Sequence, residues 1–130
     1  MIRPLAGLAA GLGVAIVTMV SVEAVGNRLF PPPAGYDLSQ GSALSLPFET
    51  LVWPVIGWLL GALAGSWVAL RASGQRWPAW VVTVCVLAAS LLNLALIRHP
   101  AWMITAGVLT PLFGGWLGQQ IEIRTRRSRA

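Results

Sequence analysis

The sequence predicts an all-α fold: a four-helix bundle integral to a membrane, with residues 1–130 forming one membrane domain. Three observations lead to this prediction. First, 56% of the residues are hydrophobic and 10% are charged, whereas an ordinary soluble domain carries about 25% charged residues. Second, four apolar segments are each long enough to cross a bilayer. Third, the arginines are divided unequally between the two sides that these segments define.

A helix needs about 20 predominantly apolar residues to cross the hydrocarbon core of a bilayer. Four segments meet this requirement, and each begins with a proline: 4–26, 47–70, 78–97 and 100–121. Proline is well tolerated at the first helical position, because its missing N–H would have no partner there. The remaining segments are predicted to be an outer loop (27–46), two short turns between spans and a basic cytoplasmic tail (122–130).

The arginines predict the orientation of the chain in the membrane. Seven of the nine lie on the side of the two termini, and only Arg28 and Arg98 lie on the other. The seven are Arg3, Arg71, Arg76, Arg124, Arg126, Arg127 and Arg129. Cytoplasmic loops carry an excess of Lys and Arg. Both termini are therefore predicted to be cytoplasmic, with membrane lipid as the surrounding partner.

The composition also excludes several classes of function. The chain has no lysine, and its arginines do not gather on one basic face, so nucleic acid is not expected as a partner. It has one cysteine (Cys85) and one histidine (His99), which leaves no metal-ligand cluster. No phosphate loop, nucleophile triad or dinucleotide fingerprint is present. We therefore expect no cofactor, no metal and no catalytic residues.

Glycines spaced four apart recur in three of the spans. They are Gly7 and Gly11 in the first, Gly57, Gly61 and Gly65 in the second, and Gly114 and Gly118 in the fourth. Such glycines share one helix face and allow two backbones to approach closely. One interpretation is packing within the bundle. The other is docking onto another membrane protein or a second copy, because three glycine faces exceed what four helices are expected to use internally.

Two prolines lie inside spans instead of at their starts. Pro54 and Pro111 each remove one backbone hydrogen bond and are predicted to kink their helices. In membranes such breaks are tolerated where a neighbouring group satisfies the freed carbonyl. The hydroxyl of Thr110, next to Pro111, is the expected partner.

The strongest functional signal is a convergence of polar residues on the outer side. Given the orientation above, Glu23 lies within about one turn of the outer end of the first span, Asn93 lies in the outer third of the third span, and His99 precedes the fourth. Arg28 and Asp37 belong to the outer loop. An ionisable residue within a span is a candidate functional residue because its placement there costs a few kcal/mol. The alternative for Glu23 is a structural ion pair or a side chain that reaches the interface.

Several of these residues carry a family resemblance. Glu23 with Gly26, the segment 29–33 (LFPPP), Asp37, Asn93 and the His99-Pro100-x-Trp102 motif resemble a group of small four-span bacterial inner-membrane proteins with no assigned activity. The resemblance extends over most of the chain. It implies a four-helix bundle in the bacterial inner membrane with a polar cluster on its outer side, and it implies no function.

Three hypotheses of function follow. The first is an accessory or assembly subunit that docks on a larger membrane complex through its glycine faces and Pro-rich loop. It requires that Gly57, Gly61 and Gly65 are not all buried inside a solitary chain. The second is a small oligomeric transporter or ligand-binding membrane protein that uses Glu23, His99 and Asn93, and it requires a cavity beside Glu23. The third is a membrane enzyme that uses Glu23 and His99 as acid and base.

Overall fold

The protein is entirely helical in its regular structure. The computed structural model describes residues 1–37, 39 and 41–130. Its elements are α1 (Ile2–Leu29), α2 (Phe48–Ser73), α3 (Arg76–Leu96) and α4 (Ala101–Arg129). All four helices are long and apolar enough to cross a membrane. The prediction of an all-α fold with four helices of membrane-spanning length is confirmed.

The prolines mark the helix starts to within one turn. Pro47 and Pro100 are N-caps, one residue outside α2 and α4, whereas Pro4 and Pro78 lie in the first turns of α1 and α3. All of these positions tolerate proline, because the first four N–H groups of a helix have no intrahelical partner. At the other end of the chain, α4 continues through the segment 122–129 that was predicted as a tail.

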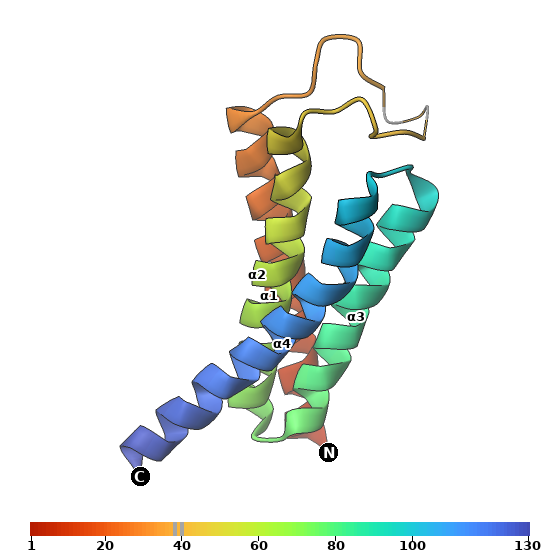
Figure 1. Ribbon diagram of the computed structural model, residues 1–130. Helices are drawn as coiled ribbons and strands as arrows, with labels where there is room; N and C mark the ends of the chain where they lie inside the picture. Colours follow the sequence, from red (N-terminus) through yellow and green to blue (C-terminus); the bar gives the residue numbers. More distant parts are fainter. Residues whose placement is uncertain (38, 40) are drawn as a thin grey trace.

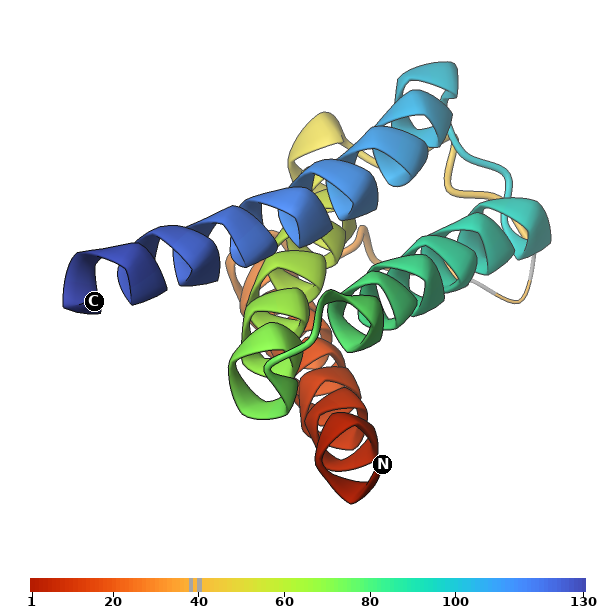
Figure 2. The same ribbon diagram turned by 90° about the horizontal axis from the view of Figure 1, so that it is seen from below.

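The helices are arranged around α2, which contacts each of the other three. Helices α1 and α4 lie on different sides of α2, and within the described residues they do not contact each other. Both termini lie at one end of the bundle, here called the termini end (Figure 1). The connections 30–47 and 97–100 lie at the opposite end, called the loop end. Seen from below, α4 crosses α2 obliquely and its last turns extend beyond the other helices (Figure 2).

Helices α1 and α2 meet backbone to backbone through their glycines. A Cβ atom added to Gly11 would lie 2.7 Å from the carbonyl oxygen of Gly65, and one added to Gly65 would lie 2.7 Å from that of Gly11. Likewise, a Cβ on Gly7 would lie 2.7 Å from the Cβ of Ser73. These separations are shorter than any ordinary side-chain contact, so only glycine allows this approach.

The contact between α2 and α4 follows the same principle. A Cβ on Gly114 or Gly118 would collide with the carbonyl oxygen of Leu59 or Leu63, respectively. All seven glycines that the spacing singled out are buried within this single chain. Gly57, Gly61 and Gly65 all face α1, so the α2 glycine face is occupied internally. The accessory-subunit hypothesis would therefore need a docking surface other than the α2 glycine face.

The backbone around Pro111 is completed by a neighbouring helix. Pro111 has no N–H for the carbonyl of Gly107, and the hydroxyl of Ser90 on α3 donates to that oxygen at 2.7 Å. Thr110, the expected partner, instead donates to the carbonyl of Ala106 at 2.8 Å. That expectation was wrong because a hydroxyl one residue before the proline bonds the carbonyl four residues behind itself. The proline frees a different carbonyl, one residue further on.

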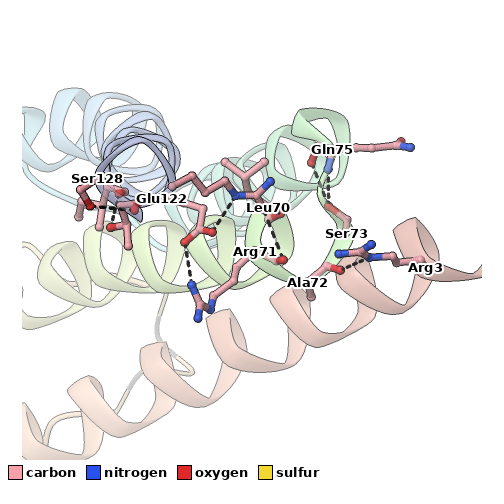
Figure 3. Close-up of polar contacts among 11 residues, drawn as sticks. Arg3, Leu70, Arg71, Ala72, Ser73, Gln75, Glu122 and Ser128 are labelled. Atoms are coloured by element: carbon pink, nitrogen blue, oxygen red, sulfur yellow. Dashed lines mark hydrogen bonds and ion pairs between the residues drawn. The ribbon is translucent and has the colours of Figure 1, made fainter. Parts of the chain in front are cut away.

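A buried carboxylate at the termini end joins α4 to α2. Glu122 is 1% exposed, and its two oxygens accept from Arg126 at 2.9 Å and from Arg71 at 3.5 Å. Figure 3 shows these contacts at the crossing of the two helices. The sequence analysis missed this residue, because it placed residues 122–130 in a solvated tail instead of on a helix that crosses α2.

Arginines from two other helices cap the C-terminal end of α2. The last carbonyls of a helix have no intrahelical partner and carry partial negative charge. Arg126 of α4 donates to the carbonyl of Leu70 at 2.9 Å, and Arg3 of α1 donates to that of Ala72 at 3.0 Å. Arg3 and Arg126, which the sequence associated only with membrane orientation, therefore also fasten α1 and α4 to the end of α2 (Figure 3).

The α1–α2 contact yields a matched pair of substitutions on one helix. We expect Gly11→Ala to lower the free energy of unfolding by about 1–3 kcal/mol, because its methyl group has no room against Gly65 and Ala69. Gly13→Ala places a methyl where no atom lies within 4 Å, so it should leave stability unchanged or raise it by up to about 1 kcal/mol. Unfolding in mixed detergent micelles, followed by helicity, measures both. Equal losses would contradict the packing described here.

The contacts of Glu122 predict a second stability effect. Glu122→Gln removes the charge that both arginines contact. We expect the free energy of unfolding to fall by about 1.5–3 kcal/mol, the usual contribution of a hydrogen bond to a charged group. Backbone amides of 123–129 should exchange hydrogen faster. Glu49→Gln, at an exposed acid in the first turn of α2, is the control and should cost less than about 1 kcal/mol. Unchanged exchange at 123–129 would show that the ion pairs do not hold α4.

Candidate functional site

A cavity of about 250 Å³ lies at the loop end of the bundle. All four helices and both connections at that end contribute to its walls. The lining residues are Glu23, Asn27, Pro32, Tyr36, Ala43, Leu46, Thr50, Leu51, Trp53, Pro54, Asn93, Ile97, His99 and Met103. The lining is mainly apolar and aromatic, with a carboxylate, two amides, an imidazole and two hydroxyls among these side chains. Such a lining is typical of small-molecule sites, although the volume is just below their usual range of about 300–1,000 Å³.

The structure places three of the five predicted polar residues around this one cavity. Glu23 of α1, Asn93 of α3 and His99 of the 97–100 connection all line it. Arg28 and Asp37 do not. Arg28 is exposed at the end of α1, and Asp37 lies in the loop, where the N–H and hydroxyl of Ser39 donate to its carboxylate at 2.8 and 2.5 Å. The cavity is therefore lined by Glu23, Asn93 and His99, and not by the two residues that were predicted to belong to the outer loop.

Glu23 lines the cavity from the α1 side and is itself an exposed residue. Gly26 is buried against Trp53, and a Cβ atom at Gly26 would collide with the indole ring. Glu23 lies on the same side of α1, three residues earlier. Within the described part of the chain, both ion pairs belong to Glu122, so the Glu23 carboxylate has no arginine or histidine partner. The structural ion pair considered for Glu23 is absent from the described residues.

A hydrogen bond to the backbone determines which ring nitrogen of His99 carries the hydrogen. Its Nδ1 lies 2.6 Å from the carbonyl oxygen of Ile97. A carbonyl can only accept, so Nδ1 carries the hydrogen, and Nε2 of the neutral ring is an acceptor. This bond holds the imidazole against the 97–100 connection, where it lines the cavity together with Asn93 and Met103.

The loop covers the cavity and is fastened to the turn between α3 and α4. The N–H of Ala43 donates to the carbonyl of Arg98 and the N–H of Arg98 donates to the carbonyl of Gly41, both at 2.8 Å. Gly41 has a positive φ of 68°, which favours glycine. The hydroxyl of Tyr36 donates to the carbonyl of Ser42 at 2.8 Å, which holds the two halves of the loop together. Tyr36, Ala43 and Leu46 line the cavity from the loop side.

The α2 side of the cavity carries incompletely paired polar groups. Pro54 has no N–H to offer the carbonyl of Thr50, four residues before it, and both residues line the cavity. The indole N–H of Trp53 is buried and has no hydrogen-bond partner among the described residues. Most buried polar groups in proteins are paired, and exceptions are often found where a structure performs its function.

Four lining residues with hydrogen-bonding side chains were not anticipated from the sequence: Asn27, Tyr36, Thr50 and Trp53. Asn27 follows Glu23 by one helical turn, so the periodicity of α1 could have indicated it. Thr50 and Trp53 lie in the first two turns of α2, at the same end as Glu23. Tyr36 carried no signal, because the path of a long loop is not encoded in local periodicity.

No protein-family model matches this chain, and neither a curated protein nor a solved structure matches it. By length and apolar composition, the four helices indicate a multi-pass membrane protein. The resemblance to small four-span inner-membrane proteins stays a prediction.

Asp37 provides a test of the loop conformation. Hydrogen bonds from the hydroxyl and the N–H of Ser39 hold the pKa of its carboxyl below the ordinary value. Because the folded pKa is lowered, this interaction exists at neutral pH and is lost as the pH falls through the lowered pKa. We expect Ser39→Ala to raise the pKa of Asp37 towards its ordinary value, measured by a carboxyl ¹³C NMR titration. Ser45→Ala is the control, and an unchanged midpoint in Ser39→Ala would contradict this loop geometry.

Proposed function

We propose that this protein is a ligand-binding protein of the bacterial cytoplasmic membrane that takes up a small solute in the loop-end cavity. One observation carries the proposal: Glu23, Asn93 and His99, which come from three separate segments of the chain, line a single cavity. The unpaired carboxylate of Glu23 adds to this, because an ionisable group in a membrane-spanning helix is expensive to keep without a use.

The proposed orientation places both termini in the cytoplasm and the cavity on the outer side. Seven arginines lie at the termini end, and two lie at the loop end. This imbalance is the one that orients multi-pass proteins. The cavity would then take its solute from the outer side of the membrane.

The accessory-subunit hypothesis has less support. It was motivated by glycine faces in excess of internal need, and the structure uses those faces inside the chain. The solute-binding hypothesis required a cavity beside Glu23, and one is present. Oligomerisation, or a partner on the lipid-facing surfaces, is compatible with solute binding and is not needed to complete the cavity.

The proposal is tested by the reactivity of a cysteine placed in the cavity wall. Thr50→Cys, in a Cys85→Ala background, puts a thiol of similar size in the lining. In lipid nanodiscs it should react with a small neutral methanethiosulfonate, and Asn93→Trp, which fills the cavity, should slow that reaction at least about tenfold. The exposed Ser45→Cys serves as the fully reactive control. A thiol at position 50 that stays inert while one at 45 reacts would refute an accessible cavity.

Native mass spectrometry distinguishes the two leading hypotheses. Protein extracted gently from its own membrane should appear as the bare chain or as its homo-oligomer, with or without a small bound mass. If a bound mass is present, it should be lost in Asn93→Trp. A stoichiometric second polypeptide would instead support the accessory-subunit hypothesis and name the partner.

A further inference from the structure

Glu23 is the one formally charged side chain among the described residues that line the loop-end cavity. Among the described residues that line it, Glu23 is the only acid and no arginine is present. The chain contains no lysine. The two arginines of the loop end, Arg28 and Arg98, are both exposed and outside the lining. The other titratable side chains of the lining are those of His99 and Tyr36. An anion entering this cavity would meet a carboxylate with no compensating cation.

The lining offers both hydrogen-bond donors, from Trp53, Thr50 and the two asparagines, and acceptors, from Glu23, His99 and Tyr36. Nδ1 of His99 is occupied by the carbonyl of Ile97, which leaves Nε2 to accept. The hydroxyl hydrogen of Tyr36 is directed to the carbonyl of Ser42, which leaves its oxygen lone pairs. The carboxylate of Glu23 accepts only. A ligand that pairs with these three acceptors must bring N–H or O–H donors of its own.

The rest of the wall suits the apolar part of such a ligand. Leu46, Leu51, Ile97 and Met103 line the cavity beside the polar groups, and the aromatic rings of Tyr36 and Trp53 border it. Aromatic faces attract cations through their quadrupole, and the attraction strengthens when the site is shielded from water. An apolar body with a cationic, hydrogen-donating head matches all three features of the lining.

We propose that the cavity selects small organic cations, of the class of protonated amines, whose N–H groups pair with Glu23 and whose apolar part contacts the aromatic and aliphatic wall. This inference rests on the proposed function, because it names the class of solute for the same cavity. The Glu23 carboxylate, which has no ion-pair partner among the described residues, would gain one from the ligand.

The experiment compares thiol reagents of opposite charge at one position. Thr50→Cys, in the Cys85→Ala background and in nanodiscs, is treated with a trimethylammonium-bearing and a sulfonate-bearing methanethiosulfonate. Each rate is normalised to that at Ser45→Cys under the same conditions. We expect the cationic reagent to react at least about tenfold faster, as in clefts whose charges have one sign. Glu23→Gln should bring the ratio of the cationic to the anionic reaction rate close to one.

Glu49→Gln is the matched control, because it removes the same charge next to position 50 from a residue outside the lining. We expect Glu49→Gln to keep most of the preference for the cationic reagent. Equal losses in Glu23→Gln and Glu49→Gln would show a general surface potential and overturn the inference. A ratio near one in the unaltered cavity, with both reagents reacting, would overturn it as well and leave the accessible cavity standing.

Protection by size-matched solutes provides the second readout. Benzylammonium, benzyl alcohol and benzoate share one ring and differ in charge. We expect benzylammonium to slow the neutral reagent at position 50 more than the other two do, and Glu23→Gln to remove that advantage. Protection by benzoate equal to or greater than that by benzylammonium would overturn the selection of cations. If position 50 is inert to the neutral reagent while position 45 reacts, the proposed function itself fails.

Discussion

The close backbone contact of α2 with two neighbours is the constraint on which the rest of the structure depends. Lipid removes the hydrophobic drive between helices, so association relies on close packing and hydrogen bonds. Gly11 and Gly65 permit this on one side of α2, and Gly118 against Leu63 permits it on the other. Once α2 is held in this way, Trp53 packs on Gly26 and the loop-end cavity has its α1 and α2 walls.

The acidic side chains at the two ends of the bundle have different surroundings. At the termini end, the buried Glu122 is paired with Arg71 and Arg126, and arginines cap the carbonyls at the end of α2. At the loop end, Glu23 has no such partner within the described residues and borders a cavity. The first arrangement fastens helices together. The second leaves a charge available, and for this reason the proposed ligand site is placed at the loop end.

Helix direction alone was enough to bring Glu23, Asn93 and His99 to the same end, because each lies at a known distance from the end of a span. The same reasoning could not separate these residues from Arg28 and Asp37. Whether a residue at a helix end or in a loop faces the cavity depends on helix rotation and on the path of the loop. Glu122 was missed for a related reason: hydropathy falls where α4 leaves the apolar region, although the helix itself continues.

The sequence by itself determined the class, the number of helices and the end at which each polar residue lies, because apolar length and proline position are local properties of the chain. Tertiary structure decided which surfaces meet. It used every predicted glycine face internally, supplied Ser90 instead of Thr110 to the carbonyl freed by Pro111, and folded the loop over the cavity. These outcomes depend on contacts between residues far apart in the chain, which no local pattern specifies.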